Sequence, residues 1–137
     1  MSPRYNLRKP YDLRFEARPD YCLATVSGEL WKLDVTRQYW AEIIAHATST
    51  QPKRLMLHEI TEQPLSTQDT FALVTELCEH TQFLPLRIAV LDKNPAHLNR
   101  NKLAEMIATN RGFTVRVFSD QELAETWLLA NVRAAST

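Results

Sequence analysis

Two segments of the chain indicate buried β-strands, and a helical pattern separates them. "RLMLHEI" (Arg54–Ile60) has three apolar residues in its middle, and "LRIAVLD" (Leu86–Asp92) is apolar almost throughout. A nearly continuous apolar strand is typical of a parallel sheet that is covered on both faces. The intervening pattern predicts a helix over Ser66–Thr81. Its expected inner face holds Phe71, Val74, Leu77 and Cys78.

The chain opens with a pattern of a different period. "YDLRFEA" (Tyr11–Ala17) alternates apolar and charged residues, which indicates a half-exposed strand. "RPD" (Arg18–Asp20) has the residues of a turn, and "YCLATVSG" (Tyr21–Gly28) indicates the returning strand. These segments predict an N-terminal β-hairpin.

Capping residues and apolar spacing predict two further helices before the C-terminal part of the chain. Asp34 is a candidate N-cap for a helix that ends before "TSTQP" (Thr48–Pro52). Asn94 and Pro95 begin another, and Gly112 ends it. The expected inner face of that helix holds Leu98, Leu103, Met106 and Ile107.

A strand and a final helix complete the pattern. "FTVRVF" (Phe113–Phe118) predicts the strand. Ser119 and Glu122 have the spacing of a capping box at the start of the helix. This helix is expected to bury Leu123, Trp127 and Leu128.

The resulting order is ββαβαβαβα, with about four helices. Alternating strands and helices predict an α/β fold with a mixed, mostly parallel sheet and right-handed crossovers. The chain of 137 residues suits one domain, which we place at residues 11–130. Residues 1–10 carry Arg4, Arg8 and Lys9 without an acid, so we expect a basic, loosely ordered arm. Residues 131–137 are expected to form a frayed tail.

Composition argues against several classes of function. Sixteen basic and sixteen acidic residues give a net charge of zero, which offers no support for nucleic-acid binding. The sequence contains neither a phosphate-binding loop nor a dinucleotide fingerprint, and its four histidines are not at metal-ligand spacing. We therefore expect no cofactor and no metal. Cys22 and Cys78 are expected to be buried, inert thiols.

The sequence also bears on location. It contains no apolar run long enough for a transmembrane segment, and "MSPRYNLRKP" lacks the apolar stretch of a signal peptide. A cytoplasmic protein is the resulting expectation.

Candidate functional residues follow two of the predicted strands. In open parallel sheets, binding sites cluster beyond the carboxyl ends of strands. The first set, a candidate phosphosite or partner-binding site, consists of Ser66, Thr67 and Asp69. The second, a candidate anion or partner loop within Asp92–Lys102, consists of Asp92, Lys93, Asn94, His97 and Arg100. Each set also has a purely structural explanation, because Ser66 with Asp69 and Asn94 with Pro95 are ordinary helix-start pairs.

The C-terminal half of the chain resembles a known family. "HLNRNKLAEMIATNRGFTVRVFSDQELAETWL" (His97–Leu128) is similar to the SpoIIAA-like family, which has a STAS fold and is grouped with Sec14-like lipid-binding folds. "SGEL" (Ser27–Leu30) resembles the second strand of that family and its exit. The resemblance covers roughly residues 11–129 and implies a STAS-like fold. In antagonist-type STAS domains an Asp-Ser-Ser-Gly turn carries a phosphorylated serine, and the resemblance places Ser66 at that position.

The matching turn departs from the family pattern in two places. Leu65 stands where those domains have aspartate, and Gln68 stands where they have glycine. The aspartate helps to shape the turn, and the glycine allows close approach of a partner.

Three functional hypotheses remain open from the sequence. The first is a non-enzymatic regulatory module that binds a protein partner or a second copy of itself through the start of the helix at Ser66 and the loop Asp92–Lys102. The second is a carrier of a lipophilic ligand in a Sec14-like cavity lined by Phe71, Trp40 and Trp127. The third is an enzyme that uses Asp92, His97 or His58 as acid or base. We favour the first, because no nucleophile with a base and an orienting group is evident.

Overall fold

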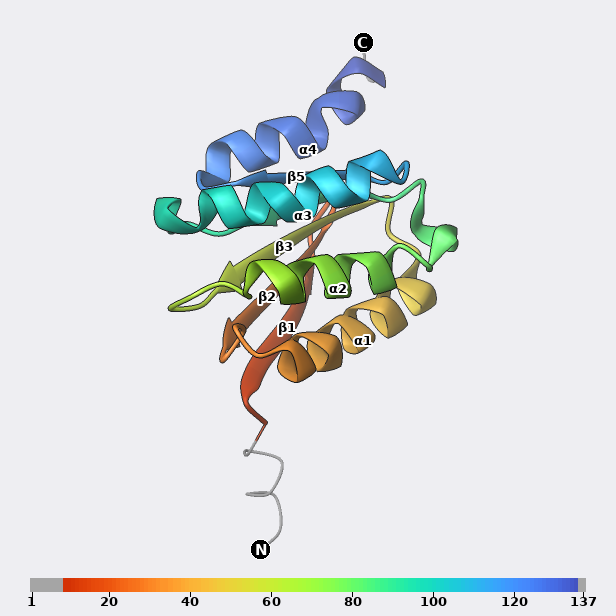
Figure 1. The fold of residues 1–137 in the computed structure, drawn as a ribbon. Helices are drawn as coiled ribbons and strands as arrows, with labels where there is room; N and C mark the ends of the chain where they lie inside the picture. The colour runs from red at the N-terminus through yellow and green to blue at the C-terminus, as the bar shows by residue number, and fades with distance from the viewer. Residues whose placement is uncertain (1–8, 136–137) are drawn as a thin grey trace, which may run out of the picture.

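The computed structural model describes the backbone of residues 9–135 and the side chains of residues 9–130. It shows an α/β fold with a five-stranded mixed sheet and four α-helices (Figure 1). The elements are β1 (Tyr11–Ala17), β2 (Cys22–Gly28), α1 (Leu33–Thr50), β3 (Arg54–Ile60), α2 (Thr67–Leu77), β4 (Arg87–Leu91), α3 (Leu98–Asn110), β5 (Thr114–Phe118) and α4 (Gln121–Ala135). Single 3-10 turns at Thr81–Phe83 and Pro95–His97 precede β4 and α3. The predicted order of strands and helices is confirmed.

The strands lie in sequence order, β1-β2-β3-β4-β5, and this order determines the layers. β1 and β2 form the antiparallel hairpin, and the remaining neighbours are parallel. Each parallel connection steps to the next strand in the same direction, so right-handed crossovers place α1, α2 and α3 on one face. Figure 1 shows these three helices in front of the sheet. α4 follows the last strand and packs against β3, β4 and β5.

Side chains of the central strands alternate between the two covered faces. Leu55 and Leu57 of β3 belong to the core beneath α1, whereas Met56 between them packs in the core beneath α4. β4 repeats the pattern, with Ile88 on the first face and Ala89 on the second. The period of two in a strand therefore explains why successive residues in the middle of both segments are apolar.

Three predicted core residues prove to be exposed. The exposed fractions of Phe71, Met106 and Leu123 are 55%, 52% and 61%. In α2 the buried positions are Thr70 and Leu73 instead. Each residue turns a helix by about 100°, so a small rotation of α2 relative to the predicted face moves Phe71 from the core to the surface.

Two predicted helix caps are also wrong. α1 begins after Lys32, which makes no side-chain capping bond, and Asp34 lies within the first turn. At α4 the Oδ1 atom of Asp120 accepts a hydrogen bond from the backbone N–H of Leu123, so Asp120 is the capping residue in place of Ser119. Asp120 and Ser119 are adjacent, and both residue types are good N-caps, so sequence does not distinguish them.

The ends of the domain differ in part from the expected boundaries. Lys9 belongs to the predicted basic arm, and its ammonium group lies 3.0 Å from a carboxylate oxygen of Glu42 on α1. Arg4 and Arg8 lie outside the described residues. At the other end, α4 continues to Ala135, past residue 130, where the sequence placed the end of the domain. Within residues 9–135, no helix has the length and apolar character that crossing a membrane requires.

Candidate functional site

The two predicted polar segments meet at one edge of the sheet. β3 and β4 are parallel neighbours, so the residues after their carboxyl ends lie at the same edge. Arg100 of α3 donates a hydrogen bond of 2.6 Å from its guanidinium group to the backbone carbonyl of Leu65. This bond ties the loop before α2 directly to the helix after β4.

Ser66 is the N-cap of α2, as predicted. Its backbone is extended, and its Oγ accepts a hydrogen bond of 3.1 Å from the backbone N–H of Asp69. Ser66 and Thr67 are both exposed, whereas Asp69 is half-buried. Ser66 therefore caps the helix, and the side chains of Ser66 and Thr67 are both exposed to solvent.

Asp92 lies at the centre of a buried hydrogen-bonded cluster that fixes the start of α3. Its exposed fraction is 4%, and that of His97 is 5%. Asp92 Oδ2 lies 2.8 Å from His97 Nδ1 and accepts from the side-chain amide of Asn101 at 3.2 Å. Asp92 Oδ1 accepts from the backbone N–H of Asn94 at 3.1 Å. Both oxygens of this buried carboxylate are therefore satisfied.

His97 contacts both Asp92 and Asn94 through its two ring nitrogens. Its Nε2 lies 3.2 Å from the amide nitrogen of Asn94, which can only donate, while Nδ1 faces the Asp92 carboxylate. Asn94 also caps the turn that begins at Pro95, because its Oδ1 accepts from the backbone N–H of Ala96. The predicted cap at Asn94 is confirmed.

The structure thus separates the five residues of the predicted anion loop. Asp92, Asn94 and His97 bond to one another at the base of the loop. Lys93 is exposed to solvent, and the guanidinium group of Arg100 is bonded to Leu65. The five side chains therefore do not converge on one point.

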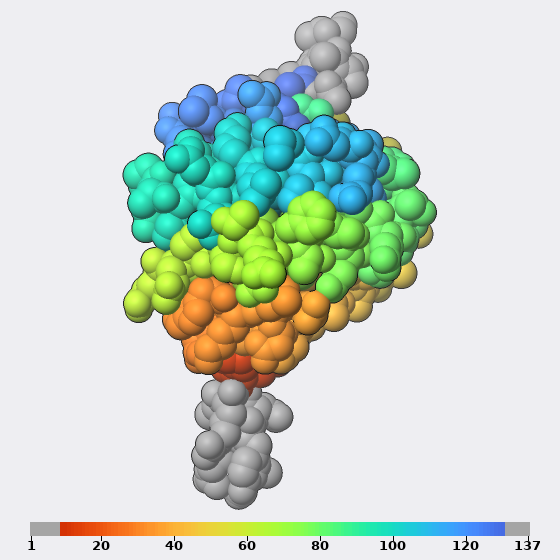
Figure 2. Space-filling model, in the orientation of Figure 1, coloured from red at the N-terminus to blue at the C-terminus, as the bar shows by residue number. Residues whose placement is uncertain are grey.

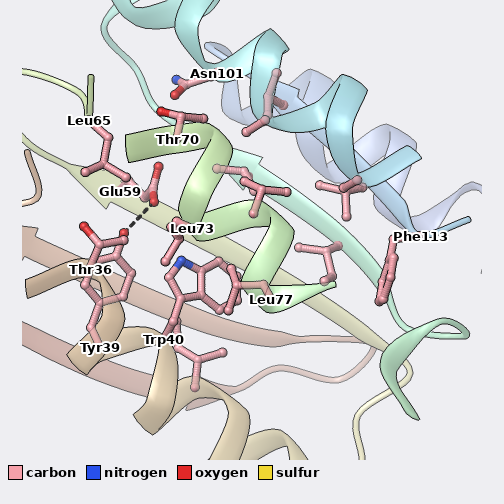
Figure 3. Close-up of a pocket in the computed structure, with 18 of the residues that line it drawn as sticks. Thr36, Tyr39, Trp40, Glu59, Leu65, Thr70, Leu73, Leu77, Asn101 and Phe113 are labelled. Atoms are coloured by element: carbon pink, nitrogen blue, oxygen red, sulfur yellow. Dashed lines mark hydrogen bonds between the residues drawn. The ribbon is translucent and has the colours of Figure 1, made fainter. Parts of the chain in front are cut away.

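A cavity of about 160 Å³ lies beneath α1, α2 and α3, against the sheet. Its lining is mainly apolar, with contributions from the three helices, from β3, β4 and β5, and from the loop that holds Leu65. Figure 3 shows Trp40, Leu73 and Leu77 along its wall, Phe113 at one end, and Glu59 towards the other. Several of the polar lining residues lie near the edge of the sheet at which the two predicted segments meet, among them Glu59, Thr70, Asp92, Arg100 and Asn101.

Glu59, a half-buried polar group of this cavity, was not among the candidate residues predicted from the sequence. Tyr39 of α1 donates a hydrogen bond of 2.8 Å from its hydroxyl to Glu59 Oε2 (Figure 3). Burial raises the pKa of the Glu59 carboxyl to about 7, and the nearby Asp92 charge adds to the rise. The sequence could have indicated that Glu59 faces the same core as Leu55 and Leu57, because the three residues are spaced by two along one strand.

The aromatic residues predicted to line a cavity are not together. Trp40 lines this one, but Phe71 is exposed on the outside of α2. Trp127 lies on the opposite side of the sheet, where the Arg87 guanidinium stacks 3.9 Å from its ring centre. The predicted Phe71–Trp40–Trp127 lining is wrong, because α4 and the other three helices cover opposite faces.

His58 and Glu59 are adjacent in β3 and therefore point to opposite faces. Burial and the charge of Lys93 lower the pKa of His58. Trp31, between β2 and α1, is half-buried. Cys22 and Cys78 are both free thiols, and burial raises the pKa of each.

Within the side chains that the structure describes, no group of three His, Cys, Asp or Glu residues is placed to hold a metal ion.

In comparisons with known proteins, no family model and no curated protein matches the chain. The resemblance to the SpoIIAA-like family therefore stays a prediction.

The buried Glu59 carboxyl should make stability depend on pH. Its pKa is about 7 in the folded protein and 4.5 ordinarily, so between these values the folded protein holds a proton that the unfolded chain has released. The free energy of unfolding should therefore fall as pH rises through this window, by roughly 3 kcal/mol in total. Glu59→Gln should lose this part of the pH dependence in urea unfolding between about pH 4 and about pH 8.

Glu62→Gln is the matched control, because Glu62 is exposed in the loop that follows β3. It should keep the wild-type dependence. Equal pH dependence in Glu59→Gln and the wild type would contradict the assignment.

Proposed function

We propose that this chain is a non-enzymatic, STAS-like regulatory module that binds a protein partner or a second copy of itself through the α2 surface. We define the α2 surface as the exposed residues Ser66, Thr67, Gln68 and Phe71. The observation that carries the proposal is that Phe71, a large apolar side chain, has an exposed fraction of 55%. It lies close to the exposed residues at the start of α2. Figure 2 shows α2 (green) on the outer face, between α1 (orange) and α3 (cyan).

The α2 surface has the composition of a small binding site. Thr67 and Phe71 are four residues apart, so they share one side of the helix. Phe71 is the large apolar side chain of this surface. Burying one such side chain against a partner contributes about 1.5–3 kcal/mol, and aromatic residues are frequent hot spots of interfaces.

α2 is held firmly on both sides, which favours binding by a preformed surface. Arg37 of α1 makes two hydrogen bonds, of 3.0 and 2.6 Å, to the carboxylate of Glu76 on α2. On the other side, Arg100 holds the Leu65 carbonyl just before the cap. Preorganisation reduces the entropy lost on binding. Arg100 belongs to the loop Asp92–Lys102, so that loop contributes to the position of the surface.

Phosphorylation of Ser66 is the proposed means of regulation. The resemblance to antagonist-type STAS domains places Ser66 at their phosphoserine position, and its hydroxyl is exposed. A phosphate there would meet the positive end of the α2 dipole and would add about two negative charges beside Phe71. The free thiols of Cys22 and Cys78 support a cytoplasmic location, where thiols stay reduced.

Replacing Phe71 with Ser should weaken association without loss of fold, because the side chain is exposed. Affinity purification of cross-linked protein from the native cells, together with light scattering of the pure protein, measures the partner and self-association. We expect at least a tenfold loss of affinity for Phe71→Ser, about 1.4 kcal/mol. Ser66→Glu in the same assay should alter binding, since it places a negative charge in the surface.

Leu123→Ser is the control for Phe71→Ser, because Leu123 is equally apolar and exposed but lies on α4. Binding that is unchanged in Phe71→Ser, or a wild-type protein that is an inert monomer without captured partners, would refute this proposal.

A second candidate function is the carriage of a small lipophilic ligand. The mainly apolar cavity of about 160 Å³ specifically favours it. Native mass spectrometry of freshly isolated protein should then show an added mass that denaturation removes. Ala104→Leu, which places a larger side chain in the cavity lining, should lose that mass, while Ala41→Leu on the exposed side of α1 should retain it. Only the mass of the bare chain in the wild type would count against this function.

A further inference from the structure

We propose that the cavity beneath α2 binds a small apolar amine, whose ammonium group pairs with the free oxygen of Glu59. The inference rests on the second candidate function, because it requires that the cavity admits a ligand. It goes further in assigning the charge of the ligand and the residue that recognises it.

The volume of the cavity restricts the size of the ligand. An apolar protein cavity of about 150 Å³ accommodates a benzene ring. The present cavity, of about 160 Å³, therefore suits a single ring or a short branched chain with one polar group. Trp40, Leu73 and Phe113 provide an apolar wall against which such a ligand could pack (Figure 3).

Glu59 uses only part of its hydrogen-bonding capacity. Its Oε2 accepts from Tyr39, while Oε1 makes no hydrogen bond to any described residue. Among the described side chains, none of the basic groups lies within salt-bridge distance of it. A half-buried carboxylate against a mainly apolar cavity is poorly solvated, and a cation that carries its own N–H donors would offset that cost.

The other charged and titratable groups at this end are already engaged. Asp92 accepts three hydrogen bonds within its cluster, and His97 completes that cluster. Arg100 donates to Leu65, and Tyr39 donates to Glu59 itself. Glu59 thus remains the group available to a ligand. Its negative charge would also repel a fatty acid or another anion, which gives the cavity selectivity by charge.

The amine should bind the ionised form of Glu59, so its affinity should depend on pH. The carboxyl has a pKa of about 7 in the empty protein. Below that value a proton competes with the amine, and the affinity falls about tenfold for each pH unit. Above it the affinity levels off, provided that the amine stays protonated.

Titrations with benzylamine and toluene, followed by NMR spectra of the backbone amides, test the assignment. For the wild type, benzylamine should bind about tenfold more tightly at about pH 8 than at about pH 6, whereas toluene should bind equally at both. Glu59→Gln should bind toluene normally, which shows an intact cavity, and should lose the pH dependence of benzylamine. Glu62→Gln should behave as the wild type.

The outcomes separate the two proposals. If toluene binds but benzylamine binds no more tightly at high pH, or if Glu59→Gln retains the effect, the amine assignment is overturned while the apolar ligand site stands. If neither compound binds the wild type, both the amine assignment and the second candidate function fail.

Discussion

Helices cover both faces of the central strands β3 and β4, so the side chains in the middle of these strands must be accommodated inside the protein. This constraint follows from the parallel connections, which place α1, α2 and α3 on one face and leave the other to α4. Apolar residues meet it by packing in the two cores. A polar side chain that is directed into either core meets it through hydrogen bonds.

Two acidic residues at the carboxyl edge of the sheet meet this constraint in different ways. Asp92 recruits donors from its own loop and from α3, and its cluster sets the start of that helix. Glu59 recruits one donor, Tyr39, and otherwise faces a cavity. The two carboxyls therefore differ in role: Asp92 fixes the start of α3, whereas one oxygen of Glu59 remains available to a ligand.

The sequence predicted the elements and some of their ends, because those depend on local patterns. Period and capping chemistry are local, so the order of the elements, the cap at Ser66 and the cap at Asn94 were predictable. The exposed position of Phe71 was not, since it depends on how α2 rotates against its neighbours. The Tyr39–Glu59 and Arg100–Leu65 bonds join residues 20 and 35 positions apart, and no local pattern specifies such pairs.

α2 connects the two proposed activities of the molecule. Its inner side, with Thr70 and Leu73, lines the cavity that contains Glu59, and its outer side presents Phe71. A ligand against Glu59 would therefore lie directly beneath the proposed partner surface.

The claim on which the cavity chemistry depends is that Glu59 is a buried carboxyl that holds its proton near neutral pH. NMR measurement of the side-chain carboxyl carbon shifts across a pH titration tests it directly, with the exposed Glu62 as an internal reference. The Glu59 signal should titrate with a midpoint of about 7, whereas a midpoint near the ordinary value of 4.5 would contradict a raised pKa of this carboxyl.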